Sequence, residues 1–200
     1  MRRTLRIMAT TMSIIVALIL VMTIGCVAVS RMGFQTWGVD GESMEPSYDD
    51  GDILYGRPAD DVRVNDVVVV RKPTAWDDGR HDSNEYIVKR IVGVGGMTIC
   101  MTEEGRLRKS CEDKAPVIDG REWNYSAGCS KVDKATRMRV PDGMVLVRGD
   151  NVNISYDSRH AQCLGLQPFV RKSDIRMRVD GSVPLGKLRN RIIGIIGGHA

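Results

Sequence analysis

A long run without charge near the N-terminus constrains this chain more than any other feature. Residues 7–29, IMATTMSIIVALILVMTIGCVAV, contain no charged side chain, and three arginines precede them. A helix rises about 1.5 Å per residue, so a helix of this length just crosses a hydrocarbon core of roughly 30 Å. Basic residues before the span predict a cytoplasmic N-terminus and an extracytoplasmic location for the remainder. We therefore expect a cytoplasmic segment at 1–6 and an uncleaved, single-pass anchor in the plasma membrane at 7–30.

Two other interpretations of this run remain open. A cleaved secretory signal ends in small residues, and Ala28 and Ser30 have that spacing, although the run is long for such a signal. A lipoprotein signal places a small residue before a cysteine, as Gly25 and Cys26 do, but the leucine usual in that signal is absent.

The rest of the chain consists of strand-like segments separated by turns. Segments rich in β-branched residues cover 52–58, 66–73, 85–96 and 137–150, and the last contains a Pro-Asp-Gly turn. No segment after the apolar run sustains a helical period of apolar residues. We therefore expect a mainly β protein that follows an N-terminal transmembrane helix.

A cysteine-containing segment interrupts this β domain. Residues 97–136 hold three of the four cysteines that follow the apolar run, which are Cys100, Cys111, Cys129 and Cys163. On the outer side of a membrane these four can form two disulfides, in three possible connectivities. We expect an inserted subdomain at 97–136, and a β domain formed by 31–96 and 137–200. The C-terminal run IIGIIGG is too short to span a bilayer and is either a terminal strand or an interfacial segment.

Composition and charge argue against several classes of protein. The net charge of +4 is small and scattered rather than gathered in a basic arm, so we expect no nucleic-acid partner. The cysteine spacings match no zinc motif and the chain has only three histidines. We therefore expect no metal site and no cofactor.

One turn segment carries a candidate nucleophile. The stretch GVDGESMEPSYDDGD, residues 38–52, is rich in glycine and acidic residues and contains Ser43. A serine hydroxyl is a poor nucleophile unless a neighbouring group removes its proton. The histidines are weak candidates for that base, since His81 lies in a polar loop, His160 in a turn and His199 at the extreme C-terminus.

Lys89 is a better candidate for the base. In YIVKRIVGV, the two-residue period of a strand places Lys89 on one face with Ile87 and Ile91, and Arg90 on the other. Burial disfavours the ammonium form, so a lysine on an apolar face can be a neutral amine near pH 7. The alternative from periodicity alone is a lysine at a sheet edge whose amine reaches solvent.

Four segments resemble, in order, the conserved boxes of type I signal peptidases. They are SMEP at 43–46, NDVVVVRKP at 65–73, YIVKRIVGVGG at 86–96 and GDNVNISYDSR at 149–159. These peptidases are membrane-anchored serine proteases that remove signal peptides from exported proteins. The resemblance implies a signal-peptidase-like antiparallel β domain behind the anchor. It implies as partners the signal peptides of membrane-engaged preproteins and the lipid bilayer.

The resemblance also implies roles for individual residues. Ser43 would be the nucleophile and Lys89 the general base, with the Ser155 hydroxyl orienting the lysine amine. Some family members carry a serine hydroxyl for the oxyanion at the position of Gly41. Glycine there leaves more of that work to the backbone amide of Ser43.

Further residues would shape and support the site. The resemblance places Met44 and Ile87 in a substrate groove that accepts small side chains at the first and third positions before the cut. Four charged residues would be support rather than chemistry: Arg90 paired with Asp150, and Asp157 with Arg159 within the last box.

The chain departs from the family at the lysine box. The residue two before the lysine is usually tyrosine, whereas here it is Ile87 and the tyrosine is displaced to Tyr86. This change concerns the shape of the groove rather than the Ser-Lys dyad. Other functions stay open: a peptidase dedicated to a pilin or conjugation substrate, a self-cleaving repressor-type peptidase, which the anchor argues against, and an inactive membrane-tethered binding domain.

Overall fold

The computed structural model divides the chain into two units, Met1–Phe34 and Gln35–Ala200. The residues that it describes are 2–31, 33–59, 61–76, 85–101, 107–108, 136–186 and 188, with side chains of the first helix described from 11 to 27. Several predictions lie outside these residues: those for His81 and His199, for the C-terminal apolar run, and for most of the inserted segment, including Cys111 and Cys129.

The first unit is a single helix, α1 (Arg2–Arg31), over the segment that the sequence predicts to be helical. Its described side chains, from 11 to 27, are all exposed, including Leu18, Leu20 and Met22. Among the residues described with their side chains, no helix has the length and hydropathy required to cross a membrane. The helix prediction is thus confirmed, and its membrane span stays a prediction.

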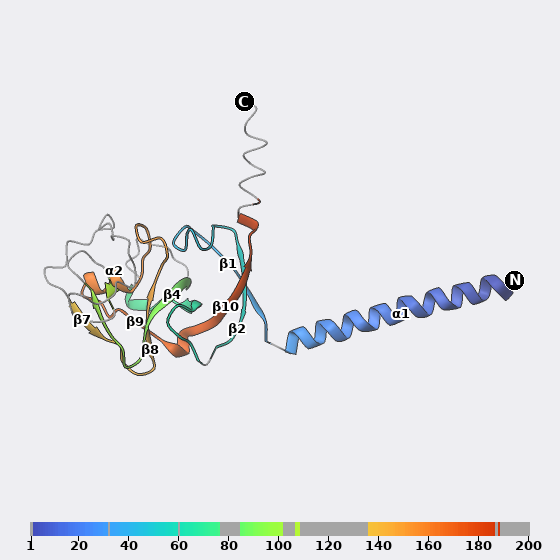
Figure 1. Ribbon diagram of the computed structural model, residues 1–200, viewed down its shortest axis with the longest axis horizontal. Coiled ribbons are helices and arrows are strands. Elements are labelled where there is room, and N and C mark those ends of the chain that lie inside the picture. The colour runs from blue at the N-terminus through green and yellow to red at the C-terminus, as the bar shows by residue number, and fades with distance from the viewer. Residues whose placement is uncertain are drawn as a thin grey trace, which may run out of the picture. The chain divides into compact units, whose positions relative to one another are not determined.

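The second unit is built on antiparallel strands, which confirms the mainly β fold (Figure 1). The larger sheet has seven strands in the order β1-β2-β10-β3-β4-β8-β9. Their bounds are β1 (Gln35–Gly38), β2 (Ile53–Arg57), β3 (Val67–Arg71), β4 (Tyr86–Val94), β8 (Met144–Arg148), β9 (Phe169–Arg171) and β10 (Ile175–Val183). The short helical elements are η1 (Thr74–Trp76), α2 (Ser158–Cys163) and η2 (Lys172–Asp174).

A smaller sheet of three strands stands beside it, in the order β6-β5-β7. Its strands are β5 (Thr98–Met101), β6 (Leu107–Arg108) and β7 (Thr136–Arg139). The sequence predicts strands on both sides of the Pro-Asp-Gly turn, and both form. They do not pair with each other, however, because β7 joins the small sheet and β8 joins the large one.

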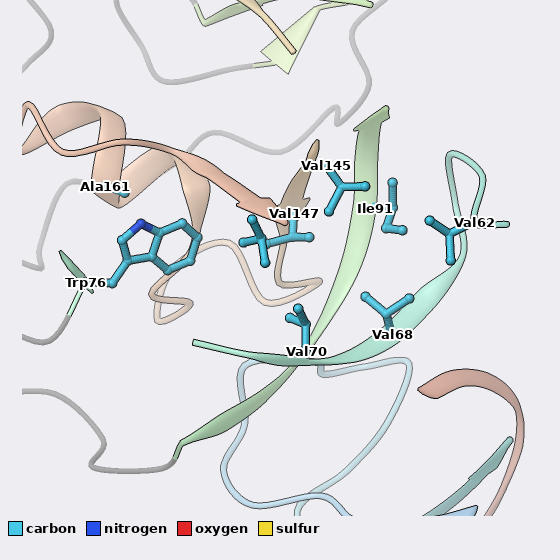
Figure 2. Close-up of a cluster of buried hydrophobic side chains, with 9 residues drawn as sticks. Val62, Val68, Val70, Trp76, Ile91, Val145, Val147 and Ala161 are labelled. Atoms are coloured by element: carbon cyan, nitrogen blue, oxygen red, sulfur yellow. The ribbon is translucent and has the colours of Figure 1, made fainter. Parts of the chain in front are cut away.

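Strand β3 explains the run of four valines in the second box. All four, Val67 to Val70, are buried. Val68 and Val70 pack in one hydrophobic cluster, whereas Val67 and Val69 pack in another. A strand covered on both faces has an uninterrupted apolar sequence rather than an alternating one. Figure 2 shows the first cluster, in which side chains of β3, β4 and β8 meet Trp76 of η1 and Ala161 of α2.

The large sheet curls so that its first strand approaches β4. In the order of hydrogen bonding, β2, β10 and β3 stand between β1 and β4. Nevertheless Trp37 of β1 packs against Tyr86 of β4, with ring centroids 5.2 Å apart. The second cluster, which includes Met44, Leu54 and Val69, packs next to this contact. The curl is therefore what brings distant parts of the sequence to one place.

The small sheet shares a core with the large one. Ile99 and Met138 of the small sheet pack with Val92 of β4 and Leu146 of β8 in a third hydrophobic cluster. Its described strands therefore add a layer to the β domain instead of enclosing a core of their own. Cys100 on β5 and Cys163 at the end of α2 are both disulfide-bonded, as expected for an oxidising location.

Candidate active site

The loop that carries Ser43 connects β1 to β2 and is closed at its base. The Val39 amide donates a hydrogen bond to the Asp52 carbonyl at 2.8 Å. Gly41 has a φ of +85°, a conformation that glycine adopts without strain. Its amide donates to Asp50 Oδ1 at 3.0 Å. Gly41 thus shapes the loop, and its own N–H is engaged within it.

Lys89 reaches Ser43 from the middle of β4. Its Nζ donates a hydrogen bond to Ser43 Oγ at 2.7 Å, and the residue is 3% exposed. The burial predicted from the two-residue period is therefore confirmed, and the alternative of a lysine reaching solvent at a sheet edge is wrong. Ser43 comes from the loop between β1 and β2, whereas β4 places its lysine opposite Val68 of β3 in the body of the sheet.

A second loop, after β8, packs against the Ser43 loop. The Asn151 amide donates to the Ser43 carbonyl at 3.0 Å. A Cβ atom on Gly149 would lie 2.1 Å from Ser155 Oγ and 2.5 Å from the Ser43 carbonyl oxygen, far inside van der Waals distance. Only glycine fits between these two groups, so Gly149 determines how closely the last box approaches the serine.

Ser155 is held by a buried carboxylate. Its Oγ donates to Asp157 Oδ2 at 2.7 Å, and Asp157 also accepts from the Gly149 amide at 3.0 Å. Arg159 donates to both carboxylate oxygens, from Nη2 at 2.7 Å and from Nε at 3.0 Å. Burial by itself would raise the pKa of Asp157, but the charge and hydrogen bonds of Arg159, with those of Gly149 and Ser155, hold it below its ordinary value. Asp157 is therefore a fixed anion that anchors the hydroxyl.

Arg90 links the last three family-like boxes, and Ser47, directly after the first box, joins the same network. Arg90 donates to Asp150 from Nε at 2.8 Å and from Nη2 at 2.5 Å, and to the Asn65 carbonyl at 2.9 Å. Ser47, beside the nucleophile segment, donates to Asp150 Oδ2 at 2.6 Å. Burial would raise the pKa of Asp150, but the hydrogen bonds from Arg90 and Ser47 outweigh it and the pKa is lowered. This network fixes the Ser43 loop against β4 and the last box.

A groove of about 550 Å³ runs from the Ser43–Lys89 pair along β1 and β4. It is lined by Thr36, Trp37, Gly38, Val39, Asp40, Ser43, Met44, Glu85, Tyr86, Ile87, Val88 and Lys89. Both residues expected in a substrate groove line it: Met44, which is 1% exposed, and the half-buried Ile87. Strand β1 is an edge strand of its sheet, so one of its sides has no neighbour among the described strands.

The geometry thus brings together the residues that sequence reasoning singled out. It adds three that the sequence reasoning missed: Gly149, Ser47 and Trp37. The position of Gly149, directly before Asp150 in the last box, could have indicated a close approach of the backbone there. Nothing in the sequence indicated that Trp37 would meet Tyr86. Among the described residues, no group of three or more histidine, cysteine, aspartate or glutamate side chains is arranged to hold a metal ion.

A serine hydroxyl beside a buried amine, at the end of a groove that exposes strand edges, is an arrangement found in serine peptidases. Comparison with known proteins also points to a peptidase. The family model described as "Signal peptidase, peptidase S26" matches residues 7–183. The chain therefore belongs to this family of peptidases, and it is an enzyme, a hydrolase.

Individual relatives are similar over most of the chain. Signal peptidase I of Bacillus amyloliquefaciens is 28% identical over 165 residues, which cover 80% of this chain and 79% of the relative. Signal peptidase I of Bacillus licheniformis is 28% identical over 138 residues, covering 66% and 69%. Mitochondrial inner membrane protease subunit 1 of Schizosaccharomyces pombe is 27% identical over 172 residues, covering 83% and 75%. A solved signal peptidase I from Enterococcus faecalis V583 covers 59% of this chain and 96% of its own, with a TM-score of 0.36 and 20% identity.

Proposed function

We propose that this protein is a membrane-bound endopeptidase that removes N-terminal signal peptides from exported proteins by a Ser43–Lys89 dyad. The observation that carries the proposal is the 2.7 Å hydrogen bond between Lys89 Nζ and Ser43 Oγ with the lysine almost fully buried. The names of the relatives, signal peptidase I in several bacteria, support the choice of substrate.

The chemistry begins with a proton transfer within the dyad. Burial disfavours the ammonium form of a lysine, so the amine of Lys89 can act as a base. It takes the hydroxyl proton as Ser43 Oγ forms a bond to the carbonyl carbon of the substrate. The C–N bond then breaks, and the proton on Lys89 passes to the leaving amine. Lys89 next takes a proton from water, whose oxygen attacks the carbonyl carbon of the acyl-enzyme. The C–Oγ bond breaks and frees the new carboxyl end, and the proton on Lys89 returns to Ser43 Oγ.

Neighbouring groups complete this proposal. The only proton of the Ser155 hydroxyl is donated to Asp157, so toward the lysine this hydroxyl can only accept. That polarity suits a group that orients the Lys89 amine. For the oxyanion, the Gly41 amide already donates to Asp50, so we assign the backbone donor role to the Ser43 amide. The fixed anions Asp150 and Asp157 act as support.

The groove suits an extended peptide. An edge of β1 and the start of β4 face the same space, and β4 pairs with β8 only from Arg90 onward. A substrate lying there as an added strand would use backbone hydrogen bonds for binding and side-chain pockets for selection. Met44 and Val39 give one wall an apolar character that suits small side chains.

The membrane-bound part of the proposal rests on α1. Its uncharged run, and the exposure of its described apolar side chains, suit a lipid environment better than water. The preceding arginines favour a cytoplasmic N-terminus and an extracytoplasmic catalytic domain. Alkaline carbonate extraction of membranes from the expressing cell tests this part. The protein should stay in the pellet, and its release into the supernatant would contradict the anchor.

The dyad is tested by two substitutions in the full-length protein in detergent. Ser43→Ala and Lys89→Ala should each abolish cleavage of a purified precursor while the circular dichroism spectrum stays that of the wild type. Matched controls are Ser173→Ala and Lys172→Ala, which remove the same groups around η2, outside the groove. These controls should cleave at the wild-type rate. Retained cleavage in either dyad variant would refute the proposed chemistry.

A further inference from the structure

A basic and aromatic cluster stands at the end of the groove away from the dyad. The guanidinium carbon of Arg176 lies 5.8 Å from the centre of the Trp37 ring and 5.6 Å from that of Tyr86. Both of these rings line the groove. Arg71 approaches the same tyrosine and donates from Nη2 to its hydroxyl at 3.1 Å. The dyad chemistry makes no use of this cluster.

A bulge in β10 aims Arg176 at this place. The register between β10 and β3 shifts between Ile175 and Met177, so Arg176 has no opposing residue on β3. Bulges of this kind redirect a side chain and recur beside functional sites. The displaced tyrosine contributes as well, because Tyr86 rather than Ile87 carries the ring that Arg176 covers.

The carboxylates near this cluster, Glu85 and Asp174, both act on Arg71. Arg71 Nη2 lies 3.1 Å from a Glu85 carboxylate oxygen, so this arginine is already paired. Among the described residues, no carboxylate lies within ion-pair distance of Arg176, which is exposed. The hydrogen bond from Arg71 lowers the pKa of Tyr86, burial opposes this effect, and a hydrogen bond from Arg176 lowers the pKa further. A guanidinium that is held by two rings and has no carboxylate partner among the described residues is a ready partner for a substrate carboxylate.

We propose that Arg176, supported by Trp37 and Tyr86, forms a subsite that selects substrates with an acidic side chain three to five residues from the scissile bond. This inference rests on the proposed function of the groove. The position follows from β4, where Tyr86 precedes Lys89 by three residues, or about 10 Å at roughly 3.3 Å per residue. An extended substrate covers that distance with the same number of residues, and the groove leads away from Ser43 in one direction, so the preference falls on one side of the cut.

The test uses quenched fluorescent peptides that span a cleavage site, with alanine at the first and third positions before the cut. Glutamine and glutamate are compared at each other position up to the fifth on either side. The wild-type protein in detergent should cleave one glutamate peptide with a kcat/KM about two to five times that of its glutamine partner, the upper part of the range expected for an exposed charge pair. In Arg176→Gln, this ratio should fall to about one if the pair is lost.

Arg178→Gln is the matched control. Arg178 lies two residues further along the same strand and pairs with Asp180 at 3.3 Å, away from the groove-lining residues. Its substitution should leave the ratio of glutamate to glutamine cleavage unchanged. A ratio near one in the wild type, or a preference that persists in Arg176→Gln with native circular dichroism, would overturn the inference.

Binding separates this inference from the proposed function. Fluorescence anisotropy with Ser43→Ala measures Kd for the same labelled peptides without cleavage. If the wild type cleaves the peptides but neither assay favours glutamate, the subsite is wrong and the peptidase stands. If no peptide is cleaved but glutamate tightens binding in an Arg176-dependent way, the subsite stands and the proposed cleavage is wrong. Absence of both cleavage and the binding preference would overturn both.

Discussion

The change from Gly149 to alanine tests whether the approach of two loops determines catalysis. The added Cβ would lie 2.1 Å from Ser155 Oγ, 2.5 Å from Ser155 Cβ and 2.5 Å from the Ser43 carbonyl oxygen. Carbon atoms in van der Waals contact are about 3.5–4.0 Å apart, so one or both groups must move by about 1 Å or more. The two groups belong to the loops that carry the nucleophile and the proposed orienting hydroxyl.

The expected magnitude follows from that displacement. A misplacement of about 1 Å in a catalytic site costs on the order of 100-fold in rate, so kcat should fall by about that factor. An extra methylene forced into a packed site typically costs about 1–3 kcal/mol of unfolding free energy. For a domain of this size, each kcal/mol lowers Tm by about 2–4 °C. Catalysis should therefore suffer much more than stability.

The assay is precursor cleavage at a temperature well below the Tm of each variant, with the folded state checked by circular dichroism. Gly93→Ala is the control, because its Cβ would crowd Ile99 and Val140 in the third hydrophobic cluster instead of the catalytic loops. It should lower Tm and leave the kcat of the folded protein near the wild-type value. If Gly149→Ala keeps kcat within about threefold of the wild type, the steric reasoning fails.

Two further predictions concern the supporting anions. Asp157→Asn should lower the unfolding free energy at pH 7 by about 3–5 kcal/mol, because it leaves the buried Arg159 unpaired. The pKa of Asp157 is below its ordinary 3.8, so its stabilisation is present above that pH and lost as the pH falls through the lower folded value. In urea titrations the difference in unfolding free energy between Asp157→Asn and the wild type should thus become smaller as the pH is lowered. A difference that stays constant with pH would contradict a charged, paired Asp157. Ser47→Ala removes the 2.6 Å hydrogen bond to Asp150 and should cost about 1.5–3 kcal/mol and lower kcat. Ser182→Ala on β10 serves as its control, and equal urea midpoints for the two variants would argue against the Arg90 network as a support.

The periodicity of β4 carried the most information about the site. Alternation placed Lys89 on an apolar face with Ile87 and Ile91, and the residue is buried as predicted. This worked because a strand in the body of a sheet has side chains fixed to one face or the other by the pleat alone. Local sequence therefore predicts burial, although it does not reveal which distant group the buried amine will meet.

Five strands fell outside the predicted strand segments: β1, β5, β6, β9 and β10. Strand β10 pairs with both β2 and β3 and is central to the sheet. Its sequence IRMRVDGSV does alternate apolar and charged residues, but the arginines and a glycine lower its β propensity. The register shifts on both of its sides interrupt the simple two-residue period as well. Strand β10 is stabilised by pairing with both β2 and β3, which compensates for the low β propensity of its sequence.

The sequence by itself determined the family, the mainly β class, the candidate nucleophile and the burial of the candidate base. Each of these depends on residue types at short spacing along the chain. The tertiary structure decided the contacts: the curl of the sheet brings β1 to β4, Ser43 to Lys89 and Trp37 to Tyr86. It also decided that Gly149 lets two loops approach closely and that Arg176 lies against the rings of Trp37 and Tyr86. Such contacts join residues far apart in sequence, and they form only when the hydrophobic clusters on both faces of β3 are buried together.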